Sequence, residues 1–135
     1  MITLEDYFMG RDKKYSKDLS GEIVNNAKET VKRANLLLIE FEKVFSNAKT
    51  RKVSSGWRPP AVNAGTKNAA RRSHHMTGKA IDISDNGNLA KWCASPAGLI
   101  ALEKIGLWLE HPGSTLTWCH VQTVPPRSGN RVFYP

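Results

Sequence analysis

Two histidines and one aspartate in this chain have side chains that bind metal ions and lie in segments that suit such a role. His75 and Asp82 stand in one short segment near the middle of the chain, and His120 follows much later. Two imidazoles and one carboxylate are a workable set of protein ligands for a catalytic zinc ion, which keeps a fourth position for water. The three residues therefore predict a Zn²⁺ site and metal-assisted hydrolysis.

Alternation along two expected strands indicates how these side chains could meet. In residues 80–83, Asp82 points away from the face that its two isoleucine neighbours turn to the core. In residues 118–122, His120 likewise points away from the neighbouring cysteine and valine. If the two strands are neighbours, Asp82 and His120 look into one cleft, and His75 can reach the same point from the preceding loop.

A long amphipathic helix is expected in the first third of the chain. From Gly21 to about Phe45, apolar residues recur at steps of three and four, which is the period of one helix face. Ser20 suits the N-cap, and Leu19 with Val24 has the spacing of a hydrophobic staple. This helix is predicted to be structural.

The rest of the chain alternates short strands, turns and helices. The expected elements are a strand at 52–55, a loop through 56–68, a strand at 80–83, helices at 88–94 and 96–105, and strands at 107–110 and 117–122 that form a hairpin. Ser95 and Pro96 begin the second of these helices and Gly106 ends it, while the tail from Pro125 to Pro135 packs back. This order predicts an α+β fold with a small antiparallel sheet that carries the metal site and helices packed against it. We interpret residues 1–135 as a single domain, with a helical part at 1–48 and the metal-site part at 49–135.

Composition places the chain among globular proteins. Its 135 residues are 40% hydrophobic and 24% charged, as in one domain with a substantial core. No stretch approaches the roughly 20 apolar residues that span a bilayer, and the first residues show neither a basic leader nor an apolar run. We therefore expect no membrane insertion and no signal peptide.

The chain is also strongly basic. Twenty lysines and arginines against twelve acidic residues give a formal net charge of +8. Such a charge attracts polyanions in general, whether nucleic acid, phosphorylated cell-wall polymers or anionic membrane surfaces. Because no nucleic-acid-binding module is recognisable and the aromatic residues do not alternate with the basic ones, we expect no specific nucleic-acid partner.

The two cysteines, Cys93 and Cys119, stand among apolar neighbours and lack the spacing of metal ligands. We interpret them as buried, reduced thiols. The sequence leaves a disulfide between them open.

The segment from Ser73 to Asp82 resembles the M15 family of zinc peptidases, the D-alanyl-D-alanine carboxypeptidases and L-alanyl-D-glutamate endopeptidases that cut peptidoglycan stem peptides. The family pattern Ser-x-His-x-x-Gly-x-Ala-x-Asp is matched by Ser73, His75, Gly78, Ala80 and Asp82. The likeness extends upstream to Ser55-Gly56-Trp57-Arg58-Pro59 and downstream to Trp118-x-His120, so that it covers roughly residues 50 to 123. The stretch from Pro125 to Gly129 is similar to bacteriophage members. The resemblance implies a fold shared with the hedgehog signalling domain.

The resemblance also implies roles for individual residues. His75, Asp82 and His120 would hold Zn²⁺, which lowers the pKa of bound water from about 15.7 toward about 7. Arg58 would bind the scissile carbonyl or the oxyanion, and Ser73 would hydrogen-bond the substrate. The alternative for Arg58 is a surface cation beside Pro59.

One position departs from the family pattern. The family usually has Glu or Asp, as the general base, three residues before the last histidine ligand, and this chain has Thr117 there. A threonine hydroxyl cannot act as a base near neutral pH. Glu110, at the end of the preceding strand and expected across from Thr117, is our candidate substitute, with His111 as a weaker one. The alternative is a glutamate that faces solvent at a strand end.

These observations favour a zinc-dependent peptidoglycan peptidase that hydrolyses a D-Ala-D-Ala or L-Ala-D-Glu bond, as a monomeric bacteriophage endolysin would. Such a lysin would reside in the host cytoplasm or the virion and act at the cell wall. The main alternative, motivated by Thr117, is a catalytically silent zinc domain that binds wall peptides or forms part of the virion. A basic nucleic-acid-binding protein is the third hypothesis.

Overall fold

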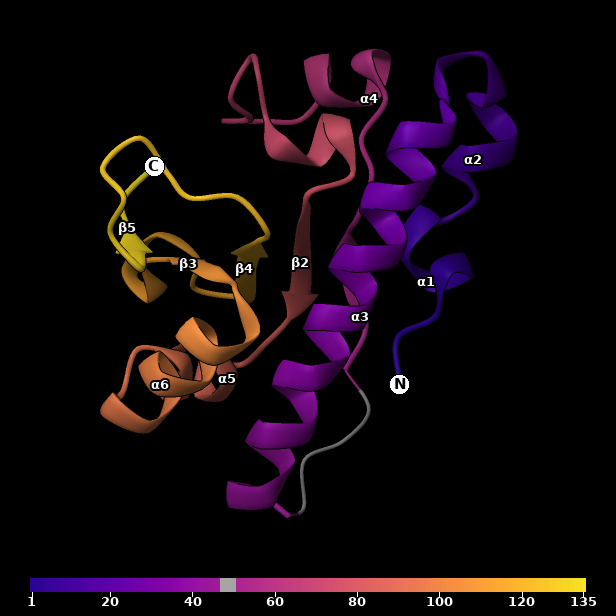
Figure 1. The fold of residues 1–135 in the computed structure, drawn as a ribbon. Helices are drawn as coiled ribbons and strands as arrows, with labels where there is room; N and C mark the ends of the chain where they lie inside the picture. The colour runs from indigo at the N-terminus through magenta and orange to yellow at the C-terminus, as the bar shows by residue number, and fades with distance from the viewer. Residues whose placement is uncertain (47–50) are drawn as a thin grey trace.

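The computed structural model describes residues 1–46 and 51–135, which form a five-stranded sheet with helices packed against it (Figure 1). An α+β fold was expected and is confirmed. The predicted boundary between a part at 1–48 and a part at 49–135 lies outside the described residues.

Three short helices precede the long N-terminal helix. They are α1 (Leu4–Phe8), α2 (Arg11–Lys14) and the 3-10 helix η1 (Ser16–Asp18). Thr3 begins α1 with a capping box, in which its hydroxyl accepts from the Asp6 N–H and the Asp6 carboxylate accepts from its own N–H. These short helices agree with the predicted helical part at 1–48, although no individual helix was predicted before residue 21.

The long helix is α3 (Gly21–Val44), close to the predicted range. Ser20 caps it as expected, because its hydroxyl accepts a hydrogen bond from the Ile23 N–H. The buried side of α3 repeats every three or four residues, and its members are Ala27, Thr30, Val31, Ala34, Leu37, Leu38 and Phe41.

The remaining elements follow the predicted alternation. In order they are β1 (Val53–Ser55), α4 (Pro60–Ala64), η2 (His74–Thr77), β2 (Ala80–Ser84), α5 (Asn88–Cys93), α6 (Pro96–Ile105), β3 (Trp108–Glu110), η3 (Pro112–Ser114), β4 (Trp118–Gln122) and β5 (Val132–Phe133). The region expected to be a loop at 56–68 contains α4, which Pro60 begins at a position where a missing N–H costs nothing.

Local signals define α6 well. The Ser95 hydroxyl accepts from the Gly98 N–H, Pro96 occupies the first turn, and Gly106 ends the helix in the left-handed region at φ 85°. All three features were predicted from the sequence.

The sheet has the strand order β1-β2-β4-β3-β5. Strands β3 and β4 pair antiparallel as the predicted hairpin, and β2 pairs antiparallel with β4. The C-terminal tail packs back as expected, but β5 runs parallel to β3. The sheet is therefore mixed, and the expectation of a purely antiparallel sheet is wrong. The chain returns to the sheet edge after a long excursion, so its direction does not follow from a hairpin turn.

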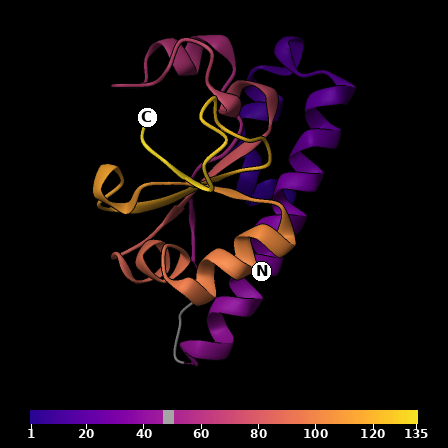
Figure 2. The ribbon, with the colours of Figure 1, turned by 60° about the vertical axis from the view of Figure 1, so that its left-hand side comes forward.

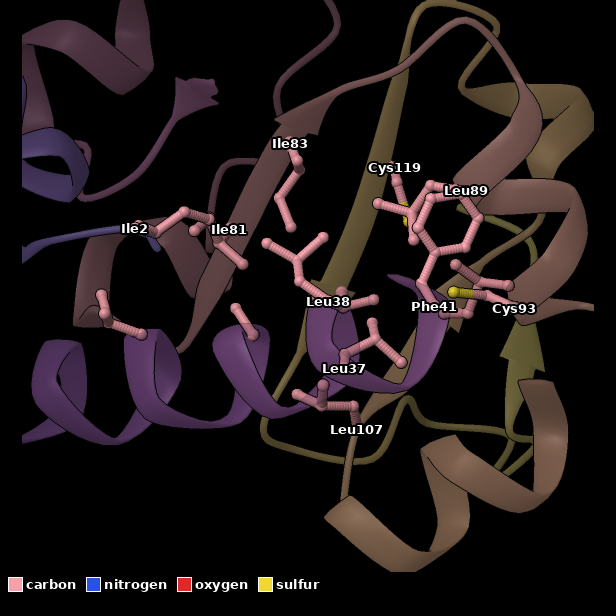
Figure 3. Packing of buried hydrophobic residues seen from close by; sticks show 14 of the residues in the cluster. Ile2, Leu37, Leu38, Phe41, Ile81, Ile83, Leu89, Cys93, Leu107 and Cys119 are labelled. Carbon is pink, nitrogen blue, oxygen red and sulfur yellow. The ribbon is translucent and has the colours of Figure 1, made fainter. Parts of the chain in front are cut away.

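The core lies between one face of the sheet and the helices. Leu38 of α3 points toward Ile83 of β2, and Phe41 of the same helix points toward Leu89 of α5 (Figure 3). Helix α6 lies beside the C-terminal half of α3 (Figure 2). Across the described residues, no helix is both long and apolar enough to cross a membrane.

Candidate metal centre

The three predicted metal ligands converge in the structure. Potential ligand atoms of His75, Asp82 and His120 all lie within 4.8 Å of one another. Asp82 and His120 are direct partners across the antiparallel pair β2–β4, and His75 comes from η2, just before β2. The expectation that alternation places Asp82 and His120 on one side, with the apolar neighbours on the other, is confirmed.

The backbone around His75 is fixed from both ends of η2. The Ser73 hydroxyl caps the helix by accepting the His75 N–H at 3.2 Å. Gly78 ends it with φ 77°, a left-handed conformation that glycine adopts without strain. A Cβ on Gly78 would lie 2.8 Å from the Ile23 carbonyl oxygen of α3, so that glycine also permits close packing of the site on that helix.

A second glycine holds the His75 ring. The Gly56 carbonyl oxygen lies 2.8 Å from His75 Nδ1. A Cβ on Gly56 would stand 1.9 Å from the carbonyl oxygen of Tyr7, so no larger residue fits between α1 and the site. Tyr7 in turn donates its hydroxyl to the Ala80 carbonyl at the start of β2. Helix α1 therefore supports the site through the contacts of Tyr7 with Gly56 and Ala80.

The hydrogen bond to Gly56 determines which His75 nitrogen faces the cluster. A carbonyl accepts only, so Nδ1 carries the hydrogen and Nε2 keeps its lone pair. Nε2 is buried, makes no hydrogen bond, and lies 3.2 Å from Asp82 Oδ1. Burial lowers the pKa of His75, which favours this neutral form. A lone pair that faces a carboxylate oxygen calls for a cation between them, so these residues fit a metal ion.

The charge of the cluster agrees with this reading. His120 Nδ1 lies 2.7 Å from the same Asp82 oxygen. Burial is the largest single influence and opposes charge on both residues, but their hydrogen bonds and the opposite charges around them together outweigh it. The pKa of Asp82 is therefore lowered and the pKa of His120 is raised. Asp82 therefore requires positive charge beside it, which a proton on His120 supplies in the metal-free protein.

Arg58 is buried in the site. Only 8% of the residue is exposed, so the alternative reading of a surface cation is wrong. Its guanidinium lies 3.4 Å from Asp82 Oδ2, the carboxylate oxygen that does not face the histidines. It also donates to Ser55 and Asn63, and its backbone N–H donates to the His75 carbonyl. Arg58 thus ties the loop before α4 to the carboxylate and to η2.

Glu110 reaches the cluster from β3. Leu109 pairs with Val121, and the same register places Glu110 beside His120, with Glu110 Oε2 4.0 Å from His120 Nδ1. The expectation that it lies across from Thr117 is wrong, because Thr117 precedes β4 on an exposed turn. The Glu110 side chain is only 16% exposed, which does not match a freely solvated glutamate. Burial raises the pKa of this carboxyl group.

The other histidines lie outside the cluster. His74 is exposed, as expected. His111 stacks on Tyr134 with ring centroids 4.5 Å apart, and its Nδ1 accepts from the Gly113 N–H.

Cys93 and Cys119 are buried and free, as interpreted from the sequence (Figure 3). A hydrogen bond between the two thiols and their burial raise the pKa of Cys119, so this thiol stays protonated. Cys119 lies on the core face of β4, and Cys93 lies in the same core at the end of α5.

Two residues of the site were not identified from the sequence, Gly56 as the His75 acceptor and Gln122 as a neighbour of His120. Gln122 Oε1 lies 3.1 Å from His120 Nε2, and the residue is almost fully buried. Alternation along the strand predicted at 117–122 places Gln122 on the same face as His120, and this spacing could have identified Gln122 as a residue of the site. The approach of Gly56 to Tyr7 joins distant segments and left no such signal.

A separate groove of about 700 Å³ lies between α3 and α6, lined by residues such as Leu36, Ile39 and Ile100. None of the metal-cluster residues lines it. Charged residues also line it, but its size alone does not make it the chemical site, because Glu29 pairs with Arg33 and Glu40 pairs with Lys43.

Comparisons with known proteins add no family assignment: no protein-family model, no curated protein and no solved structure matches this chain.

Proposed function

We propose that this protein is a zinc-dependent peptidase that hydrolyses a stem-peptide bond of peptidoglycan, with the activity and the hedgehog-like fold of the M15 peptidases that its motifs resemble. The observation that carries the proposal is the convergence of His75 Nε2, His120 Nδ1 and Asp82 Oδ1 from three separate segments. A proton on His120 compensates Asp82 in the metal-free protein, but buried His75 Nε2 has no hydrogen-bond partner, which is costly unless a cation joins it.

Zinc is the ion that this ligand set fits best. Imidazole nitrogens suit zinc, and two histidines with one carboxylate are a known catalytic combination that leaves a coordination position open. A zinc ion held there supplies a Lewis acid, which polarises a carbonyl group and makes water a nucleophile at neutral pH.

Glu110 is the proposed general base. It lies beside His120 on the neighbouring strand, and its partly buried carboxylate can accept a proton from water that attacks at the cluster. Glu110 therefore takes the part that Thr117 cannot.

Arg58 and Ser73 are the proposed substrate-binding residues. The guanidinium has five N–H donors and one of its contacts, to Asp82, is long at 3.4 Å, so it can also donate to a substrate carbonyl or to the oxyanion. Ser73 accepts one hydrogen bond in η2, and its own hydroxyl hydrogen remains available for a peptide carbonyl.

The proposed substrate is a stem peptide ending in D-Ala-D-Ala or containing L-Ala-D-Glu. The net charge of +8 favours approach to an anionic wall. In this proposal the protein is a monomeric bacteriophage lysin, made in the host cytoplasm or carried in the virion, that acts at the cell wall.

The test combines zinc analysis with a peptidoglycan digest. The purified protein should contain about one zinc per chain, and it should release free amino groups from peptidoglycan. Mass spectrometry of the released muropeptides identifies the bond that is cut. The matched pair is His75→Ala and His74→Ala, adjacent histidines of which only the first lies in the cluster. The proposal is rejected if the wild-type protein binds no zinc, or if both variants digest the wall equally well.

A catalytically silent zinc domain is the second candidate. The exposed threonine at the usual base position favours it. Stoichiometric zinc and binding to peptidoglycan, with no release of amino groups, would support this candidate over the enzyme.

A further inference from the structure

We infer that Gln122 is a positioning residue that presents the Nδ1 lone pair of His120 to the metal ion. The inference rests on the metal site of the proposed function. It concerns a side chain that touches neither the cluster centre nor, in the proposal, the substrate.

The first step is the orientation of the Gln122 amide. Its Nε2 lies 2.9 Å from the Val124 carbonyl oxygen, which can only accept a hydrogen bond. The amide nitrogen must therefore point to Val124, and the amide oxygen points the other way. Gln122 is 3% exposed, so water does not compete for these positions. The Val124 carbonyl thus settles which end of the amide faces His120.

The second step is the hydrogen on His120. The Gln122 oxygen lies 3.1 Å from His120 Nε2 and can only accept, so Nε2 must carry a hydrogen. Nδ1 is then the nitrogen available to a cation, and it is the nitrogen that lies 2.7 Å from Asp82 Oδ1. With the amide reversed, two acceptors would oppose each other at Val124. The donor and the acceptor of each hydrogen bond from Val124 through Gln122 to His120 are therefore fixed.

Each imidazole donates a hydrogen bond to an oxygen atom from one ring nitrogen, and the donating nitrogen differs between the two rings. Gly56 accepts the Nδ1 hydrogen of His75, and Gln122 accepts the Nε2 hydrogen of His120. The ligand atoms are consequently Nε2 of His75 and Nδ1 of His120. A hydrogen-bond partner on the far nitrogen of a ligating histidine fixes the ring and increases its basicity, and its loss usually weakens metal binding about 10–100-fold.

The experiment compares three variants of the full chain. Gln122→Met keeps the length of the side chain but removes the acceptor, and Gln122→Glu keeps an acceptor for the Nε2 hydrogen. Thr123→Val is the matched control, because it removes one hydrogen bond at the same strand end, to Lys79, with no link to His120. Zinc dissociation constants are measured by competition with a chromophoric chelator. The protonation of each imidazole nitrogen is read from ¹⁵N chemical shifts.

The inference expects zinc affinity to fall about 10–100-fold in Gln122→Met and to be unchanged in Thr123→Val. It expects a smaller fall in Gln122→Glu, because the carboxylate still accepts the Nε2 hydrogen although it loses the donor to Val124. In the zinc-bound wild-type protein, His120 Nε2 should carry a hydrogen and Nδ1 should carry none. An unprotonated Nε2, or equal losses in the Met and Glu variants, would overturn the inference. If the wild-type protein binds no zinc, the proposed function fails; if the wild-type protein and Gln122→Met bind zinc equally tightly, only the inference on Gln122 fails.

Discussion

The two faces of the central strand pair β2–β4 have opposite chemistry, and burial is complete on one of them and partial on the other. On the helix side, Ile81, Ile83, Cys119 and Val121 are fully buried in the apolar core. On the other side, alternate residues of the same strands carry the aspartate and histidine of the metal cluster. In this register, neighbouring residues of β2 and β4 alternate between the apolar core and the metal cluster.

The comparison shows that burial has a different consequence on each face. Apolar burial stabilises the fold by about 25 cal/mol per Å². Burial of a carboxylate or an imidazole costs free energy unless hydrogen bonds or charges compensate. The polar face accordingly gathers its partners from loops and helices outside the sheet, such as Arg58 and Gly56. The apolar face specifies the structure, and the polar face depends on it.

The largest effect is expected from a change on the polar side that leaves both faces folded. Glu110→Gln should lower the rate of peptidoglycan hydrolysis about 10²–10⁴-fold, because the amide cannot accept a proton. Zinc content and melting temperature should stay close to those of the wild-type protein. The measurement is the initial rate of amino-group release, with zinc analysis on the same samples. A loss of zinc would instead make Glu110 a metal ligand.

A truncation on the apolar face should show the reverse pattern. Ile81→Ala leaves a cavity beside Leu38 of α3 and should lower the free energy of unfolding by about 2–5 kcal/mol. The backbone of β2 keeps its pairing with β4, so zinc affinity of the folded protein should change only a few-fold. Urea unfolding and chelator competition measure the two quantities. A loss of zinc affinity equal to that of His120→Ala would show that the faces are not separable.

Gly56→Ala is expected to affect both stability and metal binding, because Gly56 contacts buried Tyr7 and also accepts a hydrogen bond from the His75 ring. The added methyl group would overlap the Tyr7 carbonyl, and relief of that overlap must move α1 or the segment after β1 that carries the His75 acceptor. Overpacking of this kind usually costs about 1–3 kcal/mol. Thermal unfolding should therefore show lower stability, and zinc affinity should fall in the same variant. Gly21→Ala is the control, since a methyl group there meets no atom within 4 Å.

The elements and the three ligands could be predicted because their signals are local. Caps and glycines mark the ends of α3 and α6, and alternation in β2 and β4 assigns each side chain to a face. His75, Asp82 and His120 needed only the further assumption that the two strands are neighbours. That assumption is confirmed by their direct pairing.

Long-range contacts account for what the sequence did not predict. The parallel direction of β5, the register that brings Glu110 beside His120, and the support of Gly56 by α1 each join segments that are far apart in the chain. Periodicity and turn chemistry carry no information on such pairings. The helices α1 and α2 were not predicted individually, because they are too short to show a helical period.

The smallest effect is expected where the polar face is held by a single local hydrogen bond. Ser73→Ala removes the cap of η2, whose hydroxyl accepts the His75 N–H, and a lost cap usually costs about 1 kcal/mol. In the proposed enzyme the same hydroxyl also donates to the substrate, so Ser73→Ala should raise KM as well as lower stability. Ser73→Thr keeps both functions of the hydroxyl and should restore stability and KM together. Recovery of stability with KM left high would limit the role of Ser73 to capping and remove it from the substrate site.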